Sequence, residues 1–434
     1  MSIIDEASQI QEHEILLRDR ALLDRLKPTG SSDKESIKAA KKVLASHRIL
    51  KARRNHPISF AYPEMLPVVQ ALPMLRESLQ ENQVTIVCGG TGSGKSTQVP
   101  KLLLQMGFGL AGQIGHTQPR RIAARAVAAR IAAETNRQLG EAVGSQVRFD
   151  KLVSPTSRLK VMTDGIVLEE IRHDRLLTNY DVIIIDEVHE RSTNIDFALG
   201  YLAKILPERP ELKVVLMSAT VDNESMLGIF NANILDIQGK QFPITIDYRP
   251  FDPTQVSEAQ AVDMALRELN DHEDVLVFLP GEREINDLQR YLNGRGFDKT
   301  EILSLFGRLN SRAQAKVFEP SNLRRIILAT NVAETSITIP GIRHVIDTGL
   351  ARTSRYNPRS KLLELPVAEI SQAAAKQRAG RCGREAPGRC IRLYDEESFE
   401  DFETFTKPEI LRTNLASSIL RCESLKLGKL ASFP

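Results

Sequence analysis

Short apolar, β-branched runs alternate with stretches of helical periodicity along most of the chain. One series of runs spans about residues 70 to 240, and a second begins near residue 250. Continuous apolar strands that alternate with helices are typical of a parallel sheet covered on both faces. The predicted strands are 84–88, 113–117, 158–162, 182–186 and 213–217, followed by 274–279, 325–329, 343–347 and 390–394.

The first 55 or so residues instead carry a helical pattern of leucines, which a break at 28–31 interrupts. Ser32 and Glu35 form a capping-box pattern that predicts the start of a second helix, rich in Lys and Arg. Such a helix is most often a solvated face, and a nucleic-acid or partner role is the alternative. We expect a helical, basic extension at 1–70 and two α/β domains at 71–245 and 246–434.

Composition adds little to this picture. The 434 residues are 42% hydrophobic and 26% charged, as in globular proteins, and no signal peptide or apolar membrane span is visible. We therefore expect a cytoplasmic protein that binds no membrane. The four cysteines lack zinc-ligand spacing, so buried reduced thiols are expected. A net charge of +3 gives no argument for nucleic-acid binding from the total, although basic residues could cluster on one face.

One glycine-rich segment carries a complete chemical pattern. Residues 89–96 match G-x-x-x-x-G-K-S, with a predicted strand before them and a predicted helix after them. Glycines allow backbone N–H groups to surround a polyphosphate, Lys95 supplies a charge for the β- and γ-phosphates, and Ser96 supplies a hydroxyl for Mg²⁺. The predicted nucleotide-binding residues here are Gly90, Thr91, Gly92, Ser93, Gly94, Lys95, Ser96 and Thr97.

An acidic pair follows the run at 182–185. Because ligands bind at the carboxyl edge of open α/β sheets, Asp186 is expected to hold Mg²⁺ and Glu187 to orient or deprotonate an attacking water. An acidic pair alone is often only a helix N-cap, but the phosphate loop strengthens the catalytic interpretation. The metal candidates are Ser96, Asp186 and Glu187. Ser218, Ala219 and Thr220 end the next strand, where the hydroxyls of Ser218 and Thr220 can hydrogen-bond across the strand ends, although by itself the segment is only a turn.

An arginine-rich segment at 377–384 lies late in the second domain. Arg381 and Arg384 are three residues apart, so on one helical turn they would face the same way. A solvated basic helix is the simpler interpretation. Hydrolysis of a triphosphate, however, needs cations near the developing charge, and arginines from a second domain would complete the site on domain closure.

Eight segments in this order resemble the motif series of the DEAH-box RNA helicases of superfamily 2. The sequence of residues 114–121 looks most like that of the bacterial HrpA-type branch. The resemblance covers roughly residues 60 to 434. The family continues into a winged-helix domain, a helical ratchet and an OB-fold, so the resemblance implies a chain truncated after its second domain. The segments are 89–96, 117–121, 163–165, 186–189, 218–220, 278–281, 329–338 and 377–384.

The resemblance implies two RecA-like domains with ATP or another nucleoside triphosphate between them and RNA across their top. The implied catalytic residues are Lys95, Glu187, Gln377, Ser336 as a γ-phosphate sensor, and Arg381 and Arg384 as arginine fingers. The base would lie loosely between Arg130 and Phe318. The implied RNA contacts are Arg120, Arg121, Thr163, Asp164, Gly165, Thr330, Asn331 and Thr338, together with Thr117 and Gln118. Residues 353–364 match the family's hairpin, with a turn at Asn357 and Pro358.

Three hypotheses remain from the sequence. The first is a monomeric, RNA-stimulated, Mg²⁺-dependent ATP hydrolase that translocates on, or remodels, single-stranded RNA or a duplex with a single-stranded tail. The second is an RNA-binding module that nucleotide switches without unwinding. The third, a metabolic kinase with a phosphate loop, is disfavoured because such enzymes need no arginines on a second α/β domain. The sequence leaves open whether the chain binds RNA or DNA.

Overall fold

The computed structural model describes residues 3–26, 34–90, 92–219, 228–237, 239, 242–319, 321–334, 339–357 and 359–427. The chain divides into two compact units, Met1–Gly239 with Ser418–Pro434, and Lys240–Ser417. The division precedes the expected boundary at 245/246 because strand β9 (Ile244–Tyr248) pairs with β18 (Gly388–Arg392) of the second unit. The last segment groups with the first unit because Cys422 and Leu425 pack into that unit's core.

The first unit contains an eight-stranded sheet in the order β4-β3-β5-β2-β6-β7-β1-β8. All neighbours are parallel except β3 and β4. The five predicted strands are confirmed to within two residues, whereas β3, β4 and β8 were not anticipated. The strands are β1 (Val84–Gly89), β2 (Gln113–Gln118), β3 (Val143–Val147), β4 (Asp150–Leu152), β5 (Leu159–Thr163), β6 (Tyr180–Ile185), β7 (Lys213–Ser218) and β8 (Asn233–Ile237).

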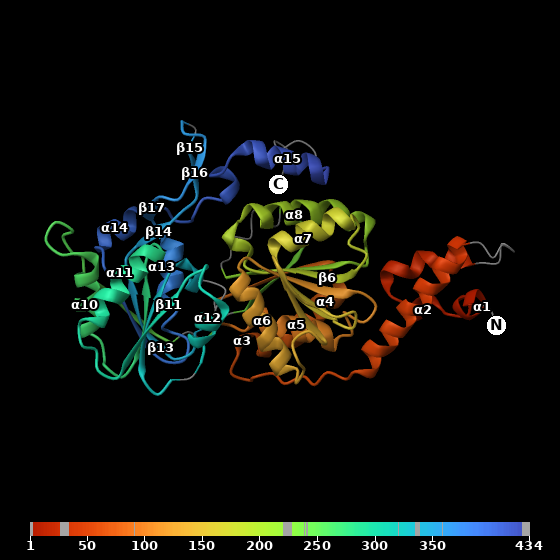
Figure 1. Cartoon of the computed structure of the whole chain (residues 1–434), viewed down its shortest axis with the longest axis horizontal. Coiled ribbons are helices and arrows are strands. Elements are labelled where there is room, and N and C mark those ends of the chain that lie inside the picture. The colour runs from red at the N-terminus through yellow and green to blue at the C-terminus, as the bar shows by residue number, and fades with distance from the viewer. Residues whose placement is uncertain are drawn as a thin grey trace. The chain divides into compact units, whose positions relative to one another are not determined.

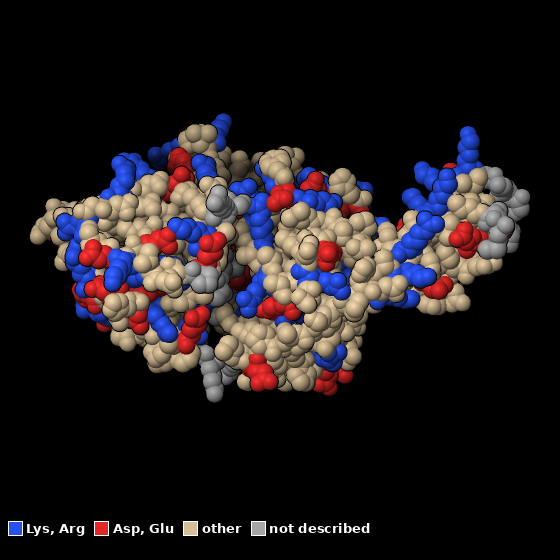
Figure 2. Space-filling view, turned by 60° about the horizontal axis from the view of Figure 1, so that its bottom comes forward, with Lys and Arg blue, Asp and Glu red and all other residues tan. Residues whose placement is uncertain are grey.

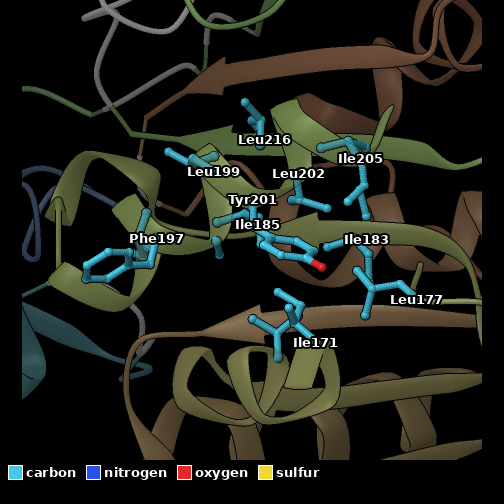
Figure 3. Packing of buried hydrophobic residues seen from close by; sticks show 14 of the residues in the cluster. Ile171, Leu177, Ile183, Ile185, Phe197, Leu199, Tyr201, Leu202, Ile205 and Leu216 are labelled. Atoms are coloured by element: carbon cyan, nitrogen blue, oxygen red, sulfur yellow. The ribbon is translucent and has the colours of Figure 1, made fainter. Parts of the chain in front are cut away.

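Helices cover both faces of this sheet, as the apolar strands predict (Figure 1). On one face α7 and α8 pack against β6 and β7, and Figure 3 shows Ile183 and Ile185 meeting Leu202 and Ile205. On the other face α4, α5 and α6 pack against the same strands. The helices are α3 (Pro67–Gln70), α4 (Leu72–Glu81), α5 (Lys95–Gln105), α6 (Arg121–Glu134), α7 (Asp164–His173), α8 (Thr193–Ile205), with the 3₁₀ turns η3 (Val188–Glu190) and η4 (Leu206–Glu208).

The second unit contains a wholly parallel six-stranded sheet in the order β11-β12-β10-β13-β18-β9. The four predicted strands are present, and β9 and β11 were not anticipated. Helices α10 and α11 pack on one face. The elements are α10 (Glu258–Arg267), β10 (Asp274–Phe278), α11 (Glu282–Asn293), β11 (Thr300–Leu305), α12 (Ser311–Lys316), β12 (Arg324–Ala329), η5 (Asn331–Ala333), β13 (Ile342–Asp347), α13 (Gln372–Ala379), α14 (Glu396–Asp401) and η6 (Glu409–Leu411). Helix α15 (Leu415–Leu425) begins at the end of this unit, and its residues from Ser418 onward group with the first unit.

Two small antiparallel pairs lie outside this sheet. The pair β15 (Arg355–Asn357) and β16 (Leu362–Glu364) confirms the predicted hairpin, with Arg355 opposite Glu364. Asn357 accepts the backbone N–H of Arg359 at 2.9 Å within the connecting turn, and Pro358 lies outside the described residues. The other pair is β14 (Leu350–Arg352) with β17 (Val367–Glu369).

Two further expectations concern the environment of the chain. No helix among the described residues combines the length and apolarity needed to cross a bilayer. The four cysteines are free and buried, as expected, and burial raises the pKa of the Cys382 thiol to about 12.

The N-terminal extension folds around its own small core. It comprises α1 (Ile3–Ser8), the 3₁₀ segments η1 (Glu12–Glu14) and η2 (Leu17–Leu26), and α2 (Lys34–Asn55). Ala40 and Val43 of α2 are fully buried against Ala7 and Ile15. The predicted cap Ser32 lies outside the described residues.

Arg53, in the last turn of α2, anchors the extension to the first unit through the loops that lead into β2 and β5 of its sheet. Its buried guanidinium donates to five carbonyl oxygens at 2.5 to 3.2 Å, and burial lowers its pKa to about 10, so it stays charged at neutral pH. The accepting carbonyls belong to Gly109, Leu110, Gly112, Pro155 and Ser157.

We expect Arg53→Met to loosen the extension without unfolding the sheet. The five carbonyls would lose a charged donor, at a cost of about 2–4 kcal/mol. Hydrogen exchange should then accelerate across residues 34–55 and stay unchanged in β6. Arg54→Met, at an exposed neighbouring position, is the control. Equal exchange in both variants would contradict the anchoring role.

Candidate active site

The phosphate loop joins β1 to α5 in the first unit. Gly94 caps α5 with φ of 90°, and Gly92 has φ of 84°, conformations that favour glycine. A Cβ on Gly94 would approach Leu66 and Val68 at 3.0 Å. Lys95 is buried, and its ammonium donates to the Gly90 carbonyl and the Ser93 hydroxyl, each at 3.1 Å, and also to the Gly89 carbonyl. The loop therefore holds its own lysine charge inside its curve.

Asp186 follows β6 directly and is almost fully buried. Its Oδ2 accepts from the Gln118 amide at 2.5 Å and lies 3.3 Å from His116 Nε2, and its Oδ1 accepts the Glu187 N–H at 2.9 Å. Burial raises the pKa of Asp186, but the polar contacts with His116 and Ser96 and the positive charge of Lys95 outweigh it, so the net shift is downward. Asp186 is therefore ionised beside the phosphate loop.

Ser96 and Asp186 bring two hard oxygen donors together at this edge. Such donors suit Mg²⁺, which usually takes only one or two protein ligands and shares the rest with water and phosphate. Among the described residues no group of three or more His, Cys, Asp or Glu side chains could hold a metal ion. The donor set therefore fits an ion that the protein shares with a bound phosphate.

Glu187 has a left-handed backbone, with φ of 55°, which is uncommon outside glycine and occurs at functional sites. The side chain is mostly buried, and its Oε2 lies 3.5 Å from His189 Nε2. His189 Nδ1 accepts the Ala219 N–H at 3.2 Å, which links the acidic segment to the end of β7. Thr220 lies outside the described residues.

His116 and Gln118 both contact Asp186, an arrangement that the sequence did not predict. Gln118 was implied in RNA contact, together with Thr117, yet all three side chains are fully buried. His116 pairs with Ile184 in the parallel register, so the pleat directs His116 and Gln118 toward the face of Asp186. Their alternation along β2 was visible in the sequence, but the β2–β6 pairing was not.

Asp164, also implied in RNA contact, is buried at the start of α7, so its side chain is withdrawn from the surface. Burial and the negative charges of Glu190 and Asp186 raise its pKa to about 7, against the opposing effect of the Thr117 and Ser192 hydroxyls. The other candidates nearby lie on or near the surface: Arg121 and Gly165 are exposed, Thr163 is half-buried, and Arg120 pairs with Glu190 at 3.5 Å.

Arg378 organises the candidate residues of the second unit. Its guanidinium is fully buried and donates to Asp347 at 2.7 Å and to Glu334 at 3.0 Å. Burial alone would lower its pKa, but the two carboxylates hold the pKa above its ordinary value. The guanidinium thus joins α13, the end of β13 and the segment after η5, a role that its sequence position did not indicate.

Arg381 and Arg384 do not share a helical turn, which corrects the expectation above. Helix α13 ends at Ala379 with Gly380 as its C-cap, and the following residues form turns. Arg381 is buried and donates to the Glu334 carbonyl, whereas Arg384 is half-buried, as is Gln377 on α13.

The remaining candidates are distributed over both units. In the first unit, Arg130 on α6 is exposed and its Nε donates to Glu134 at 2.6 Å. In the second unit, Phe318 is half-buried beyond α12, and Thr330 and Asn331 are half-buried just beyond β12. Thr91, Ser336 and Thr338 lie outside the described residues.

Comparison with known proteins gives a family match in each unit. The model for the DEAD/DEAH box helicase domain matches residues 70–227, and that for the helicase conserved C-terminal domain matches residues 258–386. The crystal structure of the Escherichia coli DEAH/RHA helicase HrpB is similar to this chain with a TM-score of 0.78 and 36% identity, covering 83% of this chain and 46% of that one. Both sheets are thus of the RecA-like helicase type.

Curated relatives are also similar over nearly the whole chain. The ATP-dependent RNA helicase HrpA of Escherichia coli is 48% identical over 97% of this chain and 33% of its own length. The HrpA homolog of Haemophilus influenzae is 51% identical, covering 88% and 30%, and the probable ATP-dependent RNA helicase DHX34 of Homo sapiens is 41% identical, covering 85% and 34%. The chain thus spans about a third of the length of these relatives.

The raised pKa of Asp164 predicts a pH-dependent stability. Because its folded-state pKa is about 7 and its ordinary value 3.8, the stability contributed by this group falls as pH rises from about 4 to 7, by up to about 4 kcal/mol. Asp164→Asn should lose this term, so thermal melts should show the variant relatively more stable at pH 8 than at pH 5. Asp298→Asn, at an exposed site, is the control. If the melting temperatures of Asp164→Asn and wild type change with pH in the same way, the assignment is contradicted.

Removing Arg378 should destabilise the second unit strongly. Arg378→Gln would leave the Asp347 and Glu334 carboxylates without their cation, and breaking a buried pair costs about 3–5 kcal/mol. The free energy of unfolding of the second unit, measured in a denaturant series with hydrogen exchange in β13 as the readout, would give this loss. The exposed Arg290→Gln should change stability by less than about 0.5 kcal/mol; similar values for the two variants would refute the organising role.

Proposed function

This chain belongs to the DEAD/DEAH box helicases, and we propose that it hydrolyses ATP in a reaction that RNA stimulates and that drives movement along, or remodelling of, RNA. One observation carries the hydrolytic part. The phosphate-loop lysine, the Ser96 hydroxyl and an ionised Asp186 meet at the carboxyl edge of the first sheet. That combination suits a bound triphosphate and a divalent cation. Packing of the sheet edge alone does not require it.

The first unit supplies binding and activation in this proposal. Backbone N–H groups of the phosphate loop and the Lys95 ammonium hold the β- and γ-phosphates. Lys95 would exchange its hydrogen bonds to the loop for phosphate oxygens. Ser96 and Asp186 would hold Mg²⁺, whose chemistry is to neutralise phosphate charge and orient the phosphates. His116 and Gln118 are positioning residues that keep the Asp186 carboxylate oriented and ionised.

Glu187 is the proposed base for the attacking water. Its carboxylate is adjacent in sequence to Asp186 and is partly shielded from solvent, which favours a proton-accepting role near a phosphate. We assign Gln377 to the same water, Ser336 to sensing the γ-phosphate, and Arg381 and Arg384 to the charge that develops on that phosphate. The local burial of Arg381 supports a role in which its guanidinium is held in place.

The contacts that we propose for the nucleotide base and for the RNA do not read base edges. Arg130 and Phe318 would stack on the base without reading its edge, so discrimination between nucleoside triphosphates should be weak. Arg120, Arg121, Thr163, Gly165, Thr330, Asn331 and Thr338 would contact phosphate and ribose, which makes recognition independent of sequence. The hairpin β15–β16 would separate strands. We also propose a cytoplasmic location and action as a monomer.

Lys95→Ala should abolish turnover because the γ-phosphate loses its charged anchor. We expect phosphate release to fall at least about a hundredfold. Lys151→Ala, at an exposed site of the same unit, is the control and should match wild type. A Lys95→Ala protein with wild-type turnover would refute the proposed site.

The RNA-dependent part is tested on the same protein. ATP hydrolysis should rise severalfold with single-stranded RNA, and a parallel titration with single-stranded DNA shows whether ribose matters. Unwinding of a tailed RNA duplex, measured alongside, separates a motor from a nucleotide-switched RNA-binding module. Hydrolysis that ignores every nucleic acid would contradict the RNA-stimulated function while leaving the nucleotide site intact.

A further inference from the structure

Helix α2 carries a concentration of positive charge that the catalytic site does not use. Its 22 residues include eight Lys or Arg and a single acidic residue, Glu35. The whole chain has a net charge of only +3, so the rest of the sequence is net acidic. Charge of one sign on one element is the electrostatic footprint of a polyanion site.

The charge lies on one face of the helix. Lys34, Lys38, Lys41 and Arg48 recur at spacings of four, three and seven residues, which places them in a row, and all four are exposed. Lys42 and Lys51 flank this row and are also exposed. We call these six residues the basic face of α2. Figure 2 shows blue side chains in a row on the extension, at the right of the view.

The basic face is unpaired within the described part of the chain. Among the described residues, no ion pair or side-chain hydrogen bond involves any of its six members. The opposite face, with Ala39, Ala40, Val43 and Leu44, forms the extension's core instead. Packing therefore needs only the apolar face, and the cations are available to a ligand.

The composition of the face favours a phosphate backbone over a protein. No exposed large hydrophobic residue occurs within α2, so the apolar or aromatic centre that protein interfaces need is absent from this helix. Without aromatic residues the face also offers no base stacking. A helix of 22 residues is about 33 Å long, which spans several successive phosphates.

Positive charge continues at the C-terminal end of the helix. A pocket of about 210 Å³ lies there, where three arginines converge and none of them pairs with a described carboxylate. Arg53 and Arg158 donate to carbonyl oxygens instead, and Arg137 donates to the carbonyl of Pro57. The lining residues are Arg53, His56, Arg137, Glu141, Ala142, Thr156 and Arg158.

We propose that the basic face of α2 is an accessory binding surface for the phosphate backbone of RNA, in addition to the RNA contacts of the two helicase domains. The inference rests on the proposed RNA-stimulated function. Because Arg53 fastens α2 to the first sheet, RNA held on this face is tethered to the unit that binds nucleotide. The surface would raise RNA affinity without reading sequence.

The test compares two triple variants of the full chain. Lys38→Gln/Lys41→Gln/Arg48→Gln removes three charges from the basic face, and Arg172→Gln/Arg175→Gln/Arg290→Gln removes three exposed charges elsewhere. Fluorescence anisotropy with a labelled single-stranded uridine RNA of about 20 nucleotides gives affinity between 50 and 300 mM KCl. For the α2 variant we expect about tenfold weaker binding at low salt and a salt slope smaller by about 2, since each phosphate contact contributes about 0.7.

The outcomes separate this inference from the proposed function. ATP hydrolysis without RNA should be equal in both variants and wild type. If the α2 variant binds RNA as the control variant does, the accessory surface is refuted while RNA-stimulated hydrolysis stands. If wild type neither binds RNA nor responds to it, the proposed function fails first. An α2 variant that binds RNA as tightly as wild type but no longer binds polyglutamate would overturn the inference in favour of an acidic protein partner.

Discussion

The first unit depends on keeping one buried carboxylate ionised. Moving a carboxylate out of water is costly unless hydrogen bonds and opposite charge replace the lost hydration. Asp186 meets this condition because Gln118, His116 and Ser96 contact it and Lys95 lies near it. Each of these residues lies in the last three residues of a strand or at the start of the helix that follows one. The requirement of one charge thus explains why several segments converge there.

Asp164 shows how much this depends on neighbours. It lies at the same edge and is equally buried, but the charges around it are those of Glu190 and Asp186. Its pKa therefore moves upward while that of Asp186 moves downward. Two aspartates at the same edge of the sheet are driven toward opposite protonation states, and only the ionised one suits a divalent cation.

The second unit applies the same constraint with the signs exchanged. The buried guanidinium of Arg378 is stable because Asp347 and Glu334 both accept from it. Arg381 in turn donates to the backbone of Glu334, so a candidate arginine finger is held by a segment that Arg378 fixes. In the extension, Arg53 acts similarly through five carbonyl dipoles, which fasten a basic helix to the sheet of the first unit.

The sequence by itself determined the fold class, the central strands, the phosphate loop, the acidic pair and the hairpin. These features are local: apolar runs, glycine positions and turn residues act within a few positions of each other. It did not reveal β3 or the edge strands β4, β8, β9 and β11, which have weaker apolar signals. Only the tertiary structure decided that β2 lies beside β6, that His116 and Gln118 support Asp186, that Asp164 is withdrawn from the surface, and that Arg378 rather than a helical turn organises the arginine segment. The physical reason is that burial and charge pairing are set by strand order and register, which bring together residues far apart in the chain.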